Sequence, residues 1–148
     1  MNVMKKIFLA LLAVIMVAGL ATAQDNVEIP FKKVPDLAQR MVKSYFPENS
    51  VVKAEKSKSK DMKNRTRVYL DNDAVLDFDK DGHWMVVDCR TSFVPMKMVN
   101  GMIQMYLGKN YPGRQVIFMG REKKNGDITI LLDDSTELHF TNENTIIE

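Results

Sequence analysis

The chain has 148 residues, with 21 Lys and Arg against 19 Asp and Glu, and a net charge of +2. Hydrophobic residues make up 45% of the chain, which excludes a disordered protein. The length suits one domain and excludes two domains of ordinary size. The single cysteine, Cys89, excludes both an intrachain disulfide framework and a multi-cysteine zinc site.

Residues 1–23 have the three-part pattern of a secretory signal peptide. Lys5 and Lys6 precede an apolar run over 7–20, and residues 21–23 form an Ala-Thr-Ala cleavage site. The run of about 14 apolar residues is shorter than the ~20 that a membrane-spanning helix needs. We therefore predict that residues 24–148 are exported to the periplasm or secreted, with no membrane span after signal cleavage.

Removal of the signal changes the charge balance. It deletes two lysines and no acid, so 21 − 2 = 19 basic residues face 19 acidic ones in the remaining 148 − 23 = 125 residues. A neutral chain lacks the excess of Lys and Arg with which proteins neutralise phosphates. The composition therefore argues against a nucleic-acid partner.

The exported part of the chain repeats itself, with an offset of 65 that becomes 62 after a short gap. At the first offset Pro30 meets Pro95 and Val51 meets Val116, and at the second Phe78 meets Phe140. Further matches of apolar type are Val34 with Val99, Leu37 with Met102, Val42 with Leu107, Phe46 with Tyr111, Pro47 with Pro112, Leu70 with Leu132, and Leu76 with Leu138. We predict two tandem units, at about 30–90 and about 94–148.

Each unit begins with a predicted amphipathic helix. Apolar residues recur at spacings of three and four, which is typical of a helix with one buried face. The first set is Val34, Leu37, Met41, Val42 and Tyr45, and the second is Val99, Met102, Ile103, Tyr106 and Leu107. An aromatic residue and a proline close both helices, because the residue before proline is driven out of the helical region.

The rest of each unit alternates between apolar and polar residues as strands do. Val68, Leu70, Leu76 and Phe78 point one way, and turn signals such as Asp81-Gly82 separate the strands. We expect an α+β fold of two tandem units, each one helix plus a four-stranded antiparallel sheet, joined into one continuous sheet with the helices on one face. The other face of this sheet stays uncovered.

These motifs resemble those of the PepSY-like family, which is similar to the beta-lactamase inhibitor protein. The resemblance rests on Val34-Pro35 to Phe46-Pro47, on Val51, on 68–70, and on the segment from Leu76 to Trp84. It covers essentially all of the exported chain. The second unit is the looser match, because 140–146 keeps the phenylalanine and lacks the Asp, Gly and Trp.

The resemblance implies an exported, non-enzymatic protein whose sheet face binds a protein partner. It names no partner, because such families share a fold while their partners differ. We therefore expect a binding or inhibitor-like module that engages a protein of the cell envelope or the exterior through the uncovered face. Strand alternation assigns to that face Arg67, Tyr69, Asp77, Leu131 and His139.

A second pattern lies in the turn between two of the predicted strands. Asp77, Asp79 and Asp81 with Gly82 and Asp88 reproduce part of the spacing of a calcium loop. The flanks read as strands rather than helices, and Asp81-Gly82 is itself a hairpin signal, so a solvated turn is the alternative interpretation. A small calcium- or ligand-binding protein, or an envelope protein with no specific ligand, is therefore the alternative function.

No catalytic residue and no cofactor is predicted. His83 and Cys89 are six residues apart on an extended segment, a separation of roughly 20 Å, which is too far for a nucleophile and its base. No motif for a serine hydrolase, a zinc peptidase or a phosphate-binding loop occurs in the sequence.

Overall fold

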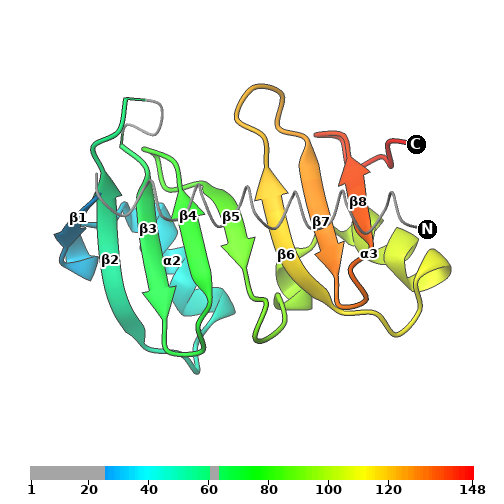
Figure 1. The fold of residues 1–148 in the computed structure, drawn as a ribbon, viewed down its shortest axis with the longest axis horizontal. Helices are drawn as coiled ribbons and strands as arrows, with labels where there is room; N and C mark the ends of the chain where they lie inside the picture. Colours follow the sequence, from blue (N-terminus) through cyan, green and yellow to red (C-terminus); the bar gives the residue numbers. More distant parts are fainter. Residues whose placement is uncertain (1–25, 61–63) are drawn as a thin grey trace, which may run out of the picture.

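The computed structural model describes residues 26–60 and 64–148. The predicted signal peptide, residues 1–23, lies outside the described residues. One antiparallel sheet of eight strands runs through the molecule, and each strand pairs with the next in chain order from β1 to β8. Figure 1 shows this sheet face-on, with its strands following one another from one end to the other.

The first unit consists of β1 (Asn26–Ile29), η1 (Phe31–Lys33), α2 (Asp36–Tyr45), β2 (Val51–Ser57), β3 (Thr66–Leu70), β4 (Val75–Phe78) and β5 (Trp84–Asp88). The second consists of η2 (Met96–Met98), α3 (Gly101–Asn110), β6 (Val116–Arg121), β7 (Ile128–Leu132) and β8 (Glu137–Phe140). None of the described helices is long and apolar enough to cross a membrane.

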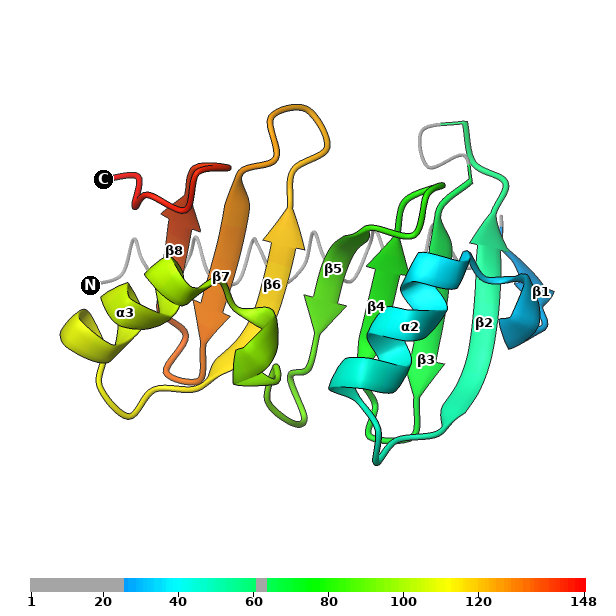
Figure 2. The ribbon, with the colours of Figure 1, turned by 180° about the vertical axis from the view of Figure 1, so that it is seen from behind.

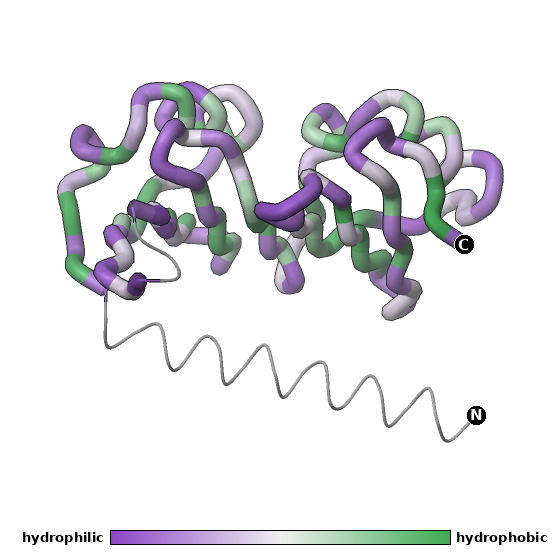
Figure 3. Tube along the Cα trace, turned by 90° about the horizontal axis from the view of Figure 1, so that it is seen from above, coloured by the Kyte–Doolittle hydropathy of each residue, from purple (hydrophilic) through white to green (hydrophobic). Residues whose placement is uncertain are grey.

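The predicted α+β class and the continuous sheet are confirmed. Both helices lie on the same side of the sheet, α2 over β3 and β4 and α3 over β7 and β8, while β5 lies under neither (Figure 2). Seen from above, the two units form adjoining lobes of one curved layer (Figure 3). The side of the sheet away from the helices, which we call the open face, carries no other element among the described residues.

The eight strands are divided between the units differently from the predicted four and four. Four strands follow α2, three follow α3, and the eighth is β1, which precedes the first helix. The counterpart of the Phe78–Trp84 pair is an isolated bridge between Phe140 and Ile146. β5 has β4 and β6 as neighbours, whereas the segment at Ile146 pairs only with β8, so it is held from one side and stays a single bridge.

The buried stripe of each helix is narrower than its apolar spacing predicts. The fully buried residues are spaced by four: Val34, Ala38, Val42 and Phe46 in the first unit, and Val99, Ile103 and Leu107 in the second. The equivalent residues Leu37 and Met102, predicted on the buried face, are 37% and 58% exposed. A helix that lies flat on a sheet buries one row of side chains, and residues three positions along the helix fall beside that row.

The two units repeat each other down to individual hydrogen bonds. The Gln39 side-chain amide donates to the Val34 carbonyl at 2.7 Å, and that of Gln104 donates to Val99 at the same distance. Bulges also recur, since the register shifts between Val51 and Lys53 and again between 116 and 118. The backbone therefore preserves a duplication that the side chains have partly erased.

One contact of the first unit has no counterpart in the second. Gly82, at φ +90°, lies so close to α2 that an added Cβ would sit 2.9 Å from the Ala38 nitrogen. Its equivalent, Asn144, also has a positive φ, of 66°, but carries a side chain and cannot approach a helix so closely. The turn after β4 can therefore pack directly on α2, because Gly82 has no side chain.

We expect Gly82→Ala to lower the free energy of unfolding by about 2–4 kcal/mol, from a positive φ and from overpacking together. Gly113→Ala is the matched control, because Gly113 has φ +77° and open space where the methyl group would go. That variant should lose only about 1–2 kcal/mol. Urea denaturation measures both, and equal losses would refute the close packing of Gly82 on α2.

Candidate functional site: the open face of the sheet

The strand register arranges the open face as two rows of residues that cross the sheet. Residues directly opposite each other in neighbouring strands point to the same face. The first row is Glu28, Glu55, Arg67, Asp77, Val86, Gly120, Thr129 and His139. The second row is Lys53, Tyr69, Val75, Asp88, Phe118, Leu131 and Glu137.

All five residues predicted for the open face lie in these two rows. The structure brings them together in two groups rather than one. Arg67, Tyr69 and Asp77 lie on the first unit, whereas Leu131 and His139 lie on the second, with β5 and β6 between the groups.

A paired charge occupies the first unit. The Arg67 guanidinium donates two hydrogen bonds to the Asp77 carboxylate, at 2.7 and 2.9 Å, and the Asp77 side chain is only 5% exposed. The hydrogen bonds to Asp77 raise the pKa of Arg67 above its already high value, despite the cost of burial. The two side chains therefore hold each other in place, and the Arg67 guanidinium stays charged at neutral pH.

Glu55 is the centre of a second polar network on the same unit. Its carboxylate forms an ion pair with Lys53 and accepts hydrogen bonds from Asn26 Nδ2 at 3.1 Å and from the Tyr69 hydroxyl at 3.2 Å. Burial raises the pKa of Glu55, but these partners outweigh it and bring the pKa below its usual value. The Lys53 ammonium also lies 5.4 Å from the centre of the Tyr69 ring.

An apolar hollow lies on the open face where β5 of the first unit meets β6 and β7 of the second. A cavity of about 350 Å³ is lined by Met85, Val86, Phe118, Gly120 and Leu131, with polar residues at its margin. The Arg90 guanidinium lies over the Phe118 ring, 5.7 Å from its centre. We call this cavity the apolar hollow.

The hollow exists because the two units carry different residues at equivalent positions. Phe118 and Leu131 pair with each other as Lys53 and Tyr69 do in the first unit. Gly120 takes the place of Glu55, and the Phe118 ring lies against it, with its Cε1 atom 3.1 Å from where a Cβ would be. The open face is consequently charged over β2 to β4 and apolar over β5 to β7, and β8 adds the polar residues Glu137, at the margin of the hollow, and His139.

A bulge adds a further residue to the hollow. Asp77 pairs with Val86 and Phe78 pairs with Trp84, so Met85 is the extra residue of β5. Met85 and Val86 therefore line the same cavity although they are adjacent in the chain. Sequence analysis missed Met85, Val86, Phe118 and Arg90, because alternation does not locate bulges.

The turn after β4 gathers three possible metal ligands. Ligand atoms of Asp79, Asp81 and His83 lie within 4.8 Å of one another. One Asp79 oxygen already accepts the backbone N–H groups of Asp81 and His83, both at 2.9 Å. Asp77 is not brought to this cluster, since both of its oxygens bind Arg67.

The cysteine lies apart from both histidines. Cys89 is fully buried in the core, and burial raises the pKa of its thiol to about 11. His139 lies on the open face, where its Nδ1 is 3.2 Å from Thr129 Oγ1 and its Nε2 is 2.9 Å from Glu137 Oε1. The described residues thus bring no imidazole to the thiol.

Solved structures with the same fold are described as periplasmic proteins. A "putative calcium-regulated periplasmic protein" from Bacteroides thetaiotaomicron has a TM-score of 0.79 and 32% identity, over 85% of this chain and 97% of that one. A "putative periplasmic protein" from Bacteroides vulgatus has a TM-score of 0.78 and 30% identity over the same shares. Another protein of that organism, of unknown function, has a TM-score of 0.75 at 22% identity, over 83% and 97%, and shows the fold alone.

Among curated proteins, none matches the chain. The model of the family described as "Putative beta-lactamase-inhibitor-like, PepSY-like" matches it twice, over residues 20–73 and 64–148. The two matches agree with the duplication seen in the backbone. The resemblance found in the sequence is confirmed, and the chain belongs to the PepSY-like, beta-lactamase-inhibitor-like family.

Proposed function

We propose that this protein is an exported, non-enzymatic binding module that engages a protein partner of the envelope or the exterior through its open face. Export is supported by the signal pattern of residues 1–23 and by the periplasmic description of its solved relatives. The observation that carries the proposal is that the apolar hollow lies beside charged side chains of the first unit that are already paired with one another.

The shape of the face favours a protein over a small molecule. The hollow, at about 350 Å³, lies at the lower end of the range of small-ligand sites, about 300–1,000 Å³, and it opens onto a face eight strands wide. A protein interface of standard size covers roughly 800 Å² on each partner. One apolar side chain of the partner would fill the hollow while the surrounding rows provide the rest of the contact area.

The charged end of the face is suited to specificity. Arg67 and Asp77 are held by each other, and Glu55 is held by its own partners, so these side chains lose little freedom on binding. Such fixed charges contribute little affinity. Their main effect is to disfavour partners whose surface charges do not complement them. The chemistry of Cys89 also favours binding over catalysis, because a buried thiol with a pKa of about 11 is protonated at neutral pH.

We expect Phe118→Ala to weaken partner binding at least about tenfold, because it empties the centre of the hollow. The partner would be isolated from an envelope extract with the immobilised residues 24–148, and its affinity for purified variants measured by calorimetry. Tyr69→Ala tests the charged end in the same way.

Met105→Ala is the control for both variants, because Met105 is 77% exposed on α3, on the other side of the sheet. It should leave the affinity unchanged. Weaker binding by Met105→Ala together with unchanged binding by Phe118→Ala and Tyr69→Ala, all with native circular dichroism, would refute the choice of face.

A second candidate function is cation binding at the turn after β4. It is favoured by the cluster of Asp79, Asp81 and His83, and by the description of the B. thetaiotaomicron relative as calcium-regulated. Two carboxylates suit calcium, whereas an imidazole is a ligand for zinc and other transition metals. The donor set therefore fits calcium only in part, and the metals have to be compared.

If the turn binds calcium, millimolar calcium should raise the melting temperature, because a ligand bound only by the folded state stabilises it. Asp81→Asn should abolish the rise and leave the turn intact, since the turn is held by the Asp79 carboxylate. Glu143→Gln, at the equivalent position of the second unit, should keep it. A melting temperature that is the same in calcium, in zinc and in EDTA would rule out this function.

A further inference from the structure

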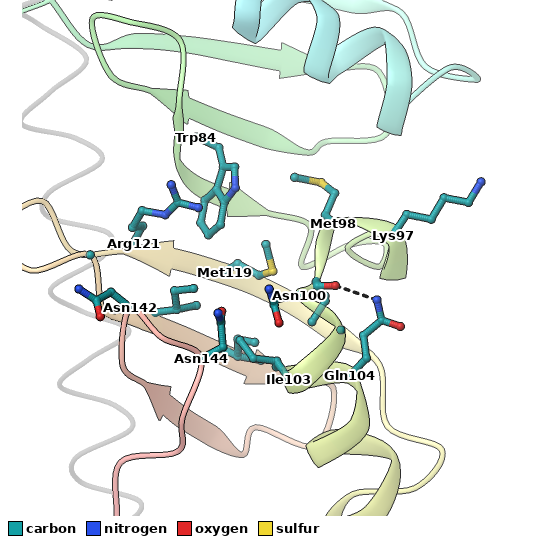
Figure 4. Close-up of a pocket in the computed structure, with 15 residues that line it drawn as sticks. Trp84, Lys97, Met98, Asn100, Ile103, Gln104, Met119, Arg121, Asn142 and Asn144 are labelled. Carbon is teal, nitrogen blue, oxygen red and sulfur yellow. Dashed lines mark hydrogen bonds between the residues drawn. The ribbon is translucent and has the colours of Figure 1, made fainter.

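A second cavity lies on the other side of the sheet, between the two units. It has a volume of about 680 Å³ and lies between β5, β6 and β7, the start of α3 and the last turn of the chain. Met119, Ile128 and Ile130 are buried side chains that give the cavity an apolar base. Asn100, Asn142 and Asn144 also line it (Figure 4). We call this cavity the helix-side groove.

One wall of the groove is a stack of an arginine on a tryptophan. The Arg121 guanidinium carbon lies 4.1 Å from the centre of the Trp84 ring, and both side chains border the groove (Figure 4). Trp84 comes from the end of the first unit and Arg121 from the second, so the groove depends on the junction of β5 with β6.

The charged residues that line the groove are of one sign. Its lining contains two cations, Arg121 and Lys97, and no Asp or Glu. Burial lowers the pKa of Arg121, and the charge of Asp79 offsets only part of this effect. Among the described residues Arg121 forms no ion pair, unlike Arg67 and Arg90. An anionic group in the groove would supply the missing partner.

The turn beside the groove is the equivalent of the turn after β4, with Asn144 at the position of Gly82. In the first unit Gly82 lies directly against α2 and leaves no room between the turn and the helix. Asn144 takes its place in the second unit, where it lines the groove together with residues from the start of α3. The space that the first unit closes is therefore open in the second.

We propose that the helix-side groove binds a short acidic peptide segment, with an Asp or Glu side chain on Arg121 and a neighbouring apolar side chain on Trp84 and the apolar base. Asn100 Oδ1 caps α3 and Asn142 Nδ2 donates to the Asn125 carbonyl, so the Asn100 amide nitrogen, the Asn142 amide oxygen and the Asn144 side chain are the groups that would donate to and accept from the backbone of an extended peptide. The positive end of α3 faces the same cavity and adds to its attraction for a carboxylate. This site lies on the other side of the sheet from the open face, and Arg121 borders both cavities.

The only tryptophan of the chain is Trp84, so its fluorescence reports directly on the groove. The probe is an acetylated and amidated pentapeptide with one central glutamate between two leucines, titrated into residues 24–148. The matched peptides carry glutamine at the centre, with either an amidated or a free C-terminus. We expect the glutamate peptide to change the fluorescence and to bind at least about tenfold more tightly than the amidated glutamine peptide.

Arg121→Gln should abolish this preference for glutamate, and Arg121→Lys should restore part of it. Arg40→Gln is the matched control, because Arg40 is exposed on α2 away from the groove. Calorimetry measures the same affinities without relying on Trp84, and near-ultraviolet circular dichroism confirms that each variant is folded.

Equal affinity for the glutamate and glutamine peptides, or a glutamate preference that survives Arg121→Gln, would overturn the proposal. Tighter binding of the peptide with the free C-terminus would assign the groove to a terminal carboxylate and overturn the side-chain assignment. Tyr69→Ala, on a part of the open face that lines neither cavity, should leave peptide binding unchanged, so that this test is distinguished from that of the proposed partner site.

Discussion

The ladder between β5 and β6 is the contact that turns two small units into one molecule. It consists of three register pairs, Val86 with Gly120, Val87 with Met119, and Asp88 with Phe118. The backbone extends it further, since the amide of Cys89 donates to the Ile117 carbonyl at 2.8 Å. Both rows of the open face cross this ladder. The wall of the helix-side groove is formed by one side chain from each of the same two strands. Every surface that we consider functional therefore requires the two units to stay paired.

The two units share one backbone fold through duplication. Their surfaces differ because different side chains now stand at equivalent positions. Where the first unit has a buried ion pair between Arg67 and Asp77, the second has a hydrogen-bond contact between Thr129 and His139. Where the first unit closes a turn with Gly82, the second leaves a groove beside Asn144. The backbone tolerates these exchanges because the core residues behind them, such as Phe78 and Phe140, are retained.

Strand alternation was sufficient for part of the site and misleading for the rest. It placed Arg67 and Leu131 correctly on the open face, because β3 and β7 are regular between the core residues on either side. Counting by twos from the buried Val116 would place Phe118 in the core, and only the bulge at Ile117 brings it to the open face. A bulge is a tertiary adjustment of one strand to its neighbour, so the pattern of a single sequence does not reveal it.

Other differences between the structure and the sequence-based predictions come from tertiary contacts, including contacts of an element that was not predicted. The network of Glu55 depends on Asn26, which comes from β1, a strand of four residues without a clear alternating pattern. The narrow helix stripes follow from how each helix lies on its sheet, and spacing alone cannot distinguish Ile103 from Met102. The fold class and the repeat were predictable because they depend on many residues at once.

The two edges of the sheet bear on how the protein behaves at high concentration. An exposed strand edge can recruit the edge of another molecule, and short strands and nearby prolines counteract this. β1 has four residues and is followed directly by Pro30, while β8 has its outer side partly occupied by the Phe140–Ile146 bridge and by the hydrogen bond from Ile147 to His139. A wide sheet can thus offer its faces to partners while its edges resist self-association.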